Sequence, residues 1–257
     1  IGVDGIKRSW DTGNACIRPH EIHRDLLWRE CGITTTPQGW ADLETARSSF
    51  NARYWVKEET ELEKVLDKMQ EEGAFIFRYN SQGDPSYVFV KDSYASGDVS
   101  ATITDQDISI ISSKVTPLNN LITKIKFRYD RDPESEEHVN ESEFEKSESR
   151  VRFGLQTKEQ IYEKSLDIVV DSAGVTALSN YLFNIASQPK SIVDIQVVNP
   201  ELFGLEIGDI IKFSTELDDY IVGSHNYELS NKYYMITKLS RSIGKGIKIQ
   251  AREVYQS

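Results

Sequence analysis

The sequence contains one cluster of side chains of the type that binds a soft metal ion. Its members are Cys16, His20, His23 and Cys31. A structural zinc ion takes about four nitrogen or sulfur ligands in a tetrahedron. His20 and His23 lie three residues apart and would share a face of a helix, but the spacing Cys-x3-His-x2-His-x7-Cys matches no common zinc-finger pattern. We therefore assign no metal site and interpret the cluster as solvated histidines beside two packed thiols, with zinc binding as the alternative.

Other residue patterns give no enzyme motif. A nucleophilic serine or cysteine needs an adjacent base, but the sequence has no Gly-x-Ser-x-Gly motif, and His138 and His225 have no triad context. The phosphate-binding loop and the dinucleotide pattern Gly-x-Gly-x-x-Gly are absent, and the Gly-Lys-Gly of residues 244–246 fits a hairpin turn. We assign no catalytic residue and no cofactor, and we predict that the chain is not an enzyme.

Acidic pairs and aromatic rings leave one alternative open, a domain that binds or cleaves glycan. Glycoside hydrolysis needs two carboxylates held at a fixed separation in a cleft, whereas pairs such as Glu136 with Glu137 fall on predicted exposed faces. The alternating aromatic residues of 75–79 favour packing into a core over ligand binding. The aromatic residues considered are Trp10, Trp28, Trp40, Trp55, Phe75, Phe77, Tyr79, Tyr87 and Phe89.

Length, charge and cysteine content argue against a nucleic-acid clamp and a disulfide-rich protein. The 257 residues are enough for two modest domains or one large one. A net charge of −11 argues against a clamp that neutralises nucleic-acid phosphates. Two cysteines make no disulfide framework, so we expect reduced thiols. No apolar run approaches the roughly 20 residues of a membrane span. Because the sequence begins at Ile1, we expect a fragment or a processed product.

Helical spacing of apolar residues predicts three helices, over residues 19–31, 58–72 and 173–186. Proline suits the first turn of the first helix, and Gly32 is a good terminator. Residues 40–50 fit either a short helix or a loop over the core.

Alternation and turn residues predict strands. They include a hairpin of residues 74–79 and 87–91, short strands within 102–116, and strands at 192–197, 233–240 and 247–254. Residues 118–129 read as an Asn-rich turn followed by an alternating strand, and in 206–213 the Gly-Asp of 208–209 marks a tight bend into a strand. The acidic run 130–150 reads as a solvated loop or linker, with partner docking or metal binding as the alternative.

The C-terminal stretch resembles a known family. It contains Leu-Phe-Gly-Leu at 202–205, Gly-Asp-Ile-Ile at 208–211, Tyr-x-Ile-x-x-x-Ser-Arg-Ser at 234–242 and Ile-x-Ala-Arg-Glu-Val at 249–254. This order of motifs is similar to the C-terminal part of phage tail hub proteins, which form baseplate hubs and tail tips. The similarity covers residues 164–255 best and residues 16–130 more loosely.

The resemblance implies an α+β fold of mainly antiparallel, barrel-like β domains with a few packed helices. We expect an N-terminal domain at 1–130, the acidic segment at 131–150 and a C-terminal domain at 151–257. The implied function is structural: a virion component at the distal end of the tail, made in the host cytoplasm, which joins the tail tube to the tip and lines the channel used for genome ejection.

The resemblance also implies partners. We expect the chain to self-associate into a trimeric ring. We also expect it to contact a tube or distal tail protein and a tip or spike protein. DNA would pass through the channel without specific binding, and no stable membrane insertion is expected. A strand edge at 247–254 or 192–198 is the expected place for strand addition between subunits. A glycan-binding or glycan-cleaving domain of a tail assembly is the alternative function.

Overall fold

The computed structural model describes residues 15–56, 59–155, 160–218, 228–242 and 246–256. The chain forms two compact units, and each is built from two separate stretches. Unit 1 comprises Ile1–Phe89 and Ile122–Phe183, and unit 2 comprises Val90–Leu121 and Asn184–Ser257. Helices and mainly antiparallel sheets confirm the α+β class.

Three helices open unit 1: α1 (Pro19–Cys31), α2 (Trp40–Ala46) and α3 (Leu62–Gly73). The predicted α1 has the observed bounds, with proline in its first turn and Gly32 as a left-handed cap at φ 68°. Residues 40–50 do contain a short helix. The helix predicted over 58–72 begins later, at Leu62: residue 58 lies outside the described ranges, and residues 59–61 are not helical. Ala74, at φ 54°, caps this helix in place of Gly73.

The remaining elements of unit 1 are two small sheets and two helices. The hairpin pairs β1 (Ile76–Tyr79) with β2 (Pro85–Val88), and a three-stranded sheet has the order β6 (His138–Glu145), β5 (Lys124–Arg131), β7 (Ile161–Ser165). The helices are α4 (Ser147–Arg152) and α5 (Ser172–Ala186).

The acidic segment 130–150 is not a loop, contrary to prediction. It contains the end of β5, all of β6 and the start of α4. The glutamates of β6, Glu141, Glu143 and Glu145, alternate with less exposed residues and lie opposite basic residues of β5. The ion pairs include Lys124 Nζ with Glu143 Oε1 at 2.6 Å and Arg128 Nε with Glu141 Oε2 at 3.3 Å. The glutamates of β6 therefore form one solvated face of the strand. Ion pairs with the basic residues of β5 offset the repulsion between these glutamates.

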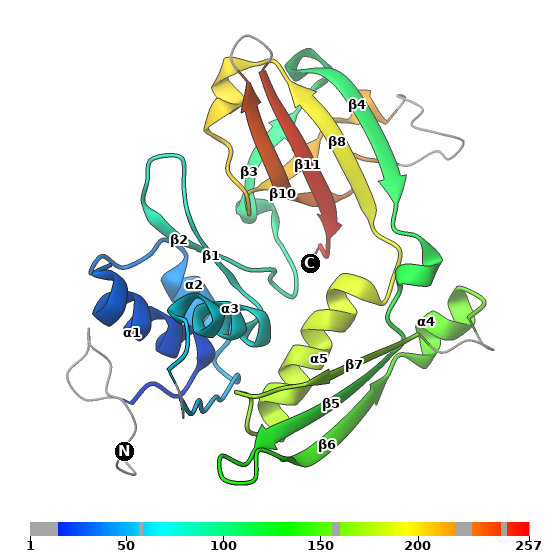
Figure 1. Ribbon diagram of the computed structural model, residues 1–257. Helices are drawn as coiled ribbons and strands as arrows, with labels where there is room; N and C mark the ends of the chain where they lie inside the picture. The colour runs from blue at the N-terminus through cyan, green and yellow to red at the C-terminus, as the bar shows by residue number, and fades with distance from the viewer. Residues whose placement is uncertain (1–14, 57–58, 156–159, 219–227, 243–245, 257) are drawn as a thin grey trace. The chain divides into compact units, whose positions relative to one another are not determined.

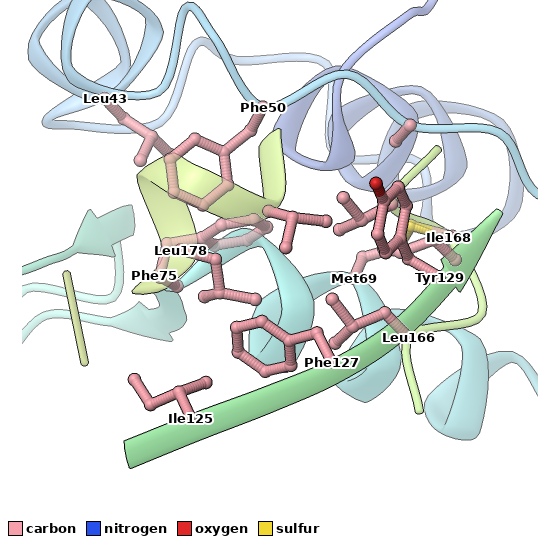
Figure 2. Close-up of a cluster of buried hydrophobic side chains, with 14 of the residues drawn as sticks. Leu43, Phe50, Met69, Phe75, Ile125, Phe127, Tyr129, Leu166, Ile168 and Leu178 are labelled. Atoms are coloured by element: carbon pink, nitrogen blue, oxygen red, sulfur yellow. The ribbon is translucent and has the colours of Figure 1, made fainter. Parts of the chain in front are cut away.

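Helix α5 lies against the β6–β5–β7 sheet (Figure 1) and closes the core of unit 1. Ile125 and Phe127 of β5 are fully buried and belong to the same cluster as Leu178 of α5. Met69 of α3 and Leu166, which follows β7, join them (Figure 2). Burial of these side chains is the main favourable term that holds the unit together.

Unit 2 contains one six-stranded sheet, ordered β3-β9-β10-β11-β8-β4. The strands are β3 (Val99–Ile103), β4 (Ile108–Val115), β8 (Ser191–Val197), β9 (Ile210–Phe213), β10 (Tyr233–Ser242) and β11 (Gly246–Val254). Short 3-10 helices are η1 (Ser96–Asp98), η2 (Asp105–Asp107), η3 (Leu118–Asn120), η4 (Pro200–Gly204) and η5 (Thr215–Leu217).

One face of the sheet of unit 2 carries an extended apolar cluster, and a smaller cluster of Ile210, Tyr233 and Met235 with Tyr94 covers part of the other face. Ile247, Ile249 and Ala251 of β11 are buried and alternate with more exposed residues, as predicted. Val193 and Ile195 of β8 extend this apolar face, which forms a core cluster of the unit. Among the described strands, β3 and β4 are the two edges and do not pair with each other, so the sheet is open where a barrel-like arrangement was expected.

The boundaries of the two units differ from the domain boundaries expected at residues 130 and 150. Strands β3 and β4 precede the acidic segment, yet they pair with β9 and β8, which follow it. Because backbone pairing across the chain decides these neighbours, each unit is discontinuous in sequence. Within the described ranges, no helix is long and apolar enough to cross a bilayer.

Candidate functional site

The histidines of the predicted metal cluster are core residues. His20 and His23 are fully buried, and the interpretation of solvated histidines is therefore wrong. The His20 ring lies 5.4 Å from the Trp40 ring, and the His23 ring lies 5.3 Å from Phe75. Aromatic partners bury both rings because α1 turns its histidine face towards α2 and the β1–β2 hairpin. Cys31, expected to be packed, is exposed, while Cys16 is half-buried.

His23 is held as a neutral ring. Its Nδ1 lies 2.9 Å from the hydroxyl oxygen of Tyr87, at hydrogen-bond distance. Burial lowers the pKa of His23 from 6.5 to about 3 and raises the pKa of Tyr87 above its usual range. In the part of the chain that the structure describes, no group of three or more His, Cys, Asp or Glu side chains is placed to hold a metal ion.

The hub-like motifs of residues 199–254 have structural contacts in unit 2. The Asn199 side chain accepts from the Glu201 backbone N–H and donates to Asp107 Oδ1 at 2.7 Å, which ties η4 to the turn between β3 and β4. Gly208 adopts φ 98°, and its N–H donates to the carbonyl of Ile236 at 2.9 Å. The Gly-Asp bend therefore fixes where β9 begins beside β10, at a φ that favours glycine.

The strand edges predicted for assembly lie inside the sheet. Strand β11 pairs with β10 on one side and β8 on the other, and β8 also pairs with β4. The expectation of a free edge at 247–254 or 192–198 is therefore wrong. It fails because residues 108–115, a short run weakly marked in the sequence, supply the strand that covers β8. Among the described strands, the edges of this sheet are β4 and β3.

A surface pocket of about 280 Å³ lies in unit 1. We call it the Trp55 pocket; it is lined by residues 54–56, Thr60, Arg131, Pro133, Glu136 and Asp167. Three separate stretches form it: the segment before α3, the turn between β5 and β6, and the residues after β7. Trp55 and Glu136 belong to patterns visible in the sequence, whereas Arg131 and Asp167 do not, because no spacing pattern joins such distant positions.

Asp167 is the fixed carboxylate of the Trp55 pocket. It forms an ion pair with Lys68, and its Oδ1 lies 3.3 Å from His138 Nε2 and 3.9 Å from Arg131 Nε. Burial alone would raise the pKa of Asp167, but the hydrogen bond and charge of Lys68, with Arg131 and His138, lower it below its usual range. A general acid for glycoside cleavage needs a raised pKa. Asp167 therefore lacks the property that the cleavage alternative requires.

Another carboxylate of unit 1 with a shifted pKa, Glu72, is a structural acceptor. It is buried, and its carboxylate accepts backbone N–H groups of Asp167 and Ile168, each at 3.0 Å. Burial raises the pKa of Glu72, and these hydrogen bonds oppose the rise. The contacts fix the chain where it leaves β7 and thereby position Asp167.

No family model and no curated protein sequence matches the chain. Its structure is similar to those of three tail proteins. A prophage tail protein from Listeria monocytogenes is 11% identical with a TM-score of 0.42, over 80% of this chain and 57% of that one. A 43 kDa prophage tail protein from Shewanella oneidensis is 9% identical with a TM-score of 0.45, over 79% and 57%. A tail protein from Neisseria meningitidis is 8% identical with a TM-score of 0.47, over 83% and 64%.

The chain thus spans less than two thirds of the length of each of these three structures. At such identities and TM-scores, the likeness does not by itself define a function for this chain.

Proposed function

We propose that the chain is a structural, non-enzymatic component of the tail of a phage or phage-tail-like particle, located in the hub at its distal end. The observation that carries this proposal is the fold of residues 199–254. The stretch that resembles hub proteins forms β9, β10 and β11, three adjacent strands of one sheet. Its motif residues Asn199 and Gly208 lie at the turns that set the order of these strands.

The open edges of the unit 2 sheet support assembly by strand addition. Strand β4 has eight residues, and Lys114 is its single charged side chain. Strand β6, an edge in unit 1, carries Glu141, Glu143 and Glu145, and such charges protect an edge from pairing. Because β4 carries fewer charged side chains than β6, we propose β4 as the edge that pairs with a partner strand.

A ring follows if β4 of one copy meets β3 of the next. Because the two edges are different surfaces, the contact is head-to-tail, which is the type of interface that closes cyclic rings. We propose a trimer that contacts a tube or distal tail protein on one side and a tip or spike protein on the other. The ring would line the channel through which DNA passes during ejection, without specific binding to the nucleic acid.

Light scattering over a range of protein concentrations tests this proposal. We expect a trimer, or a mass that grows with concentration towards a trimer. A monomer at every concentration, also in the presence of a tube or tip protein from the same particle, contradicts it.

The variants Ser112→Pro and Ser113→Pro test the edge itself. Neighbouring residues of a strand direct their N–H groups to opposite sides, so one proline breaks pairing with β8 and the other removes a donor from the outer edge. The variant that keeps the thermal stability of the unmodified chain should no longer associate. Unchanged association in that variant would rule out β4 as the contact.

A further inference from the structure

The polar wall of the Trp55 pocket consists of charges that are already paired. Lys68 and His138 hold Asp167 from within the unit. Arg131 donates from Nε to the Glu136 carbonyl at 3.2 Å and from Nη2 to Glu136 Oε2 at 3.0 Å. These mutual contacts fix donors and acceptors at the pocket surface, while the side chains of Arg131 and Asp167 remain 36% and 24% exposed.

The apolar wall of the pocket is open to solvent. Trp55 is 52% exposed and Val56 is 57% exposed, next to the paired charges. Trp28 and Trp40 of the same unit are half-buried or buried. A large apolar ring left at the rim of a polar pocket is a surface that a ligand can cover, and indole gains much from such contact.

Paired charges next to an exposed indole ring favour a neutral, polar ligand over a charged one. A charged ligand would have to compete with the existing ion pairs of Arg131 or Asp167, and it would lose hydration without a free counter-charge. A neutral ring with hydroxyl groups can accept from the guanidinium, donate to carboxylate lone pairs and place its C–H face on the indole. From this geometry we infer that the Trp55 pocket binds a neutral saccharide, with Trp55 as the stacking residue and Arg131, Glu136 and Asp167 as its hydrogen-bonding partners.

This site is independent of tail assembly. The pocket lies wholly in unit 1, whereas the edges proposed for ring formation belong to unit 2. Saccharide binding would add ligand recognition to a structural protein, and it requires no bond to be broken.

Titration of the intact chain with neutral oligosaccharides tests the inference. Maltotriose, cellotriose and chitotriose serve as probes, with tryptophan emission and calorimetry as the two readouts. At least one probe should bind saturably and shift the emission. Trp55→Ala should weaken that binding about tenfold or more, because it removes the stacked ring. Glu136→Gln keeps the shape of the side chain and should weaken binding less.

Tyr79→Ala is the matched control. Tyr79 is an exposed aromatic residue of unit 1, at 54% exposure, and does not line the pocket. Its loss should leave saccharide affinity unchanged. Failure of every probe to saturate at millimolar concentration, or equal affinity of the Trp55→Ala variant and the unmodified chain, would overturn the inference. The association state of the Trp55→Ala variant separates this result from the assembly proposal, since removing Trp55 should not alter it.

Discussion

Burial decides the chemistry of His23. The ring has no exposed surface, lies 5.3 to 5.6 Å from the rings of Phe75, Phe77 and Tyr87, and shares a hydrogen bond with the Tyr87 hydroxyl. Two histidines three residues apart suggested shared metal binding from sequence, but such spacing equally places both rings on the buried face of one helix. Only the packing of α1 against aromatic neighbours separates the two readings.

We predict that His23 makes the protein sensitive to acid. Its pKa of about 3 in the folded chain lies below the value of 6.5 for an unperturbed histidine. Between these values the unfolded chain binds a proton that the folded chain excludes. The free energy of unfolding therefore falls as pH falls, by up to about 1.4 kcal/mol per pH unit. Denaturant unfolding of the unmodified chain and of His23→Gln, from about pH 7 to pH 4, measures this effect.

The unmodified chain should lose stability faster than His23→Gln as the pH is lowered. Tyr87→Phe serves as the control, since it removes the hydrogen bond but keeps the titrating ring, and its pH profile should stay steep. Parallel profiles for the unmodified chain and His23→Gln would show that His23 does not titrate on unfolding in this range.

At the scale of elements, backbone geometry fixes the start of β11. Gly246 adopts φ 76°, and a Cβ atom at this position would lie 2.1 Å from the carbonyl oxygen of Val197. The Gly-Lys-Gly pattern predicted a hairpin turn before β11, but residues 243–245 lie outside the described ranges. The close approach of β8 was not readable from sequence, because Val197 is distant along the chain.

We predict that Gly246→Ala destabilises unit 2 by about 2 kcal/mol or more, since it adds both backbone strain and a clash with backbone. Gly97→Ala is the matched control, because a Cβ there meets nothing within 4 Å and its φ is not positive. Thermal unfolding of both variants gives the comparison. Equal melting temperatures for Gly246→Ala and Gly97→Ala would contradict the prediction. They would mean that β8 and β11 can move apart near residue 246 without loss of stability.

At the scale of the whole molecule, each unit depends on two stretches of chain. The sheet of unit 2 takes β3 and β4 from residues 90–121 and its other strands from residues 184–257. Strands β8 and β9 would each lose a neighbour without the first stretch. Unpaired strands leave backbone groups without partners and expose apolar surface.

We predict that residues 151–257 alone do not unfold cooperatively. Residues 90–121 joined by a flexible linker to residues 184–257 should do so, because this chain restores all six strands. Circular dichroism during thermal unfolding distinguishes the two fragments. Cooperative unfolding of 151–257 would instead support the domain boundary expected from the acidic segment.

Elements with local signals were predictable from the order of residues alone. The 3.6-residue spacing and caps defined α1, the alternation of Ile247, Ile249 and Ala251 defined the buried face of β11, and the Gly-Asp bend marked the start of β9. The order of hub-like motifs also came from sequence alone. Local periodicity suffices for such features because they depend on the chain within about one turn or one strand.

Which elements contact one another became clear only from the folded chain. In the folded chain β4 pairs with β8, and the glutamates of the acidic run form the charged face of β6. His20 and His23 are buried, and Arg131 and Asp167 line the same pocket as Trp55. These outcomes depend on contacts between residues far apart in sequence. The free energy of such contacts comes from burial and from pairing across strands, and neither is encoded in the spacing of neighbouring residues.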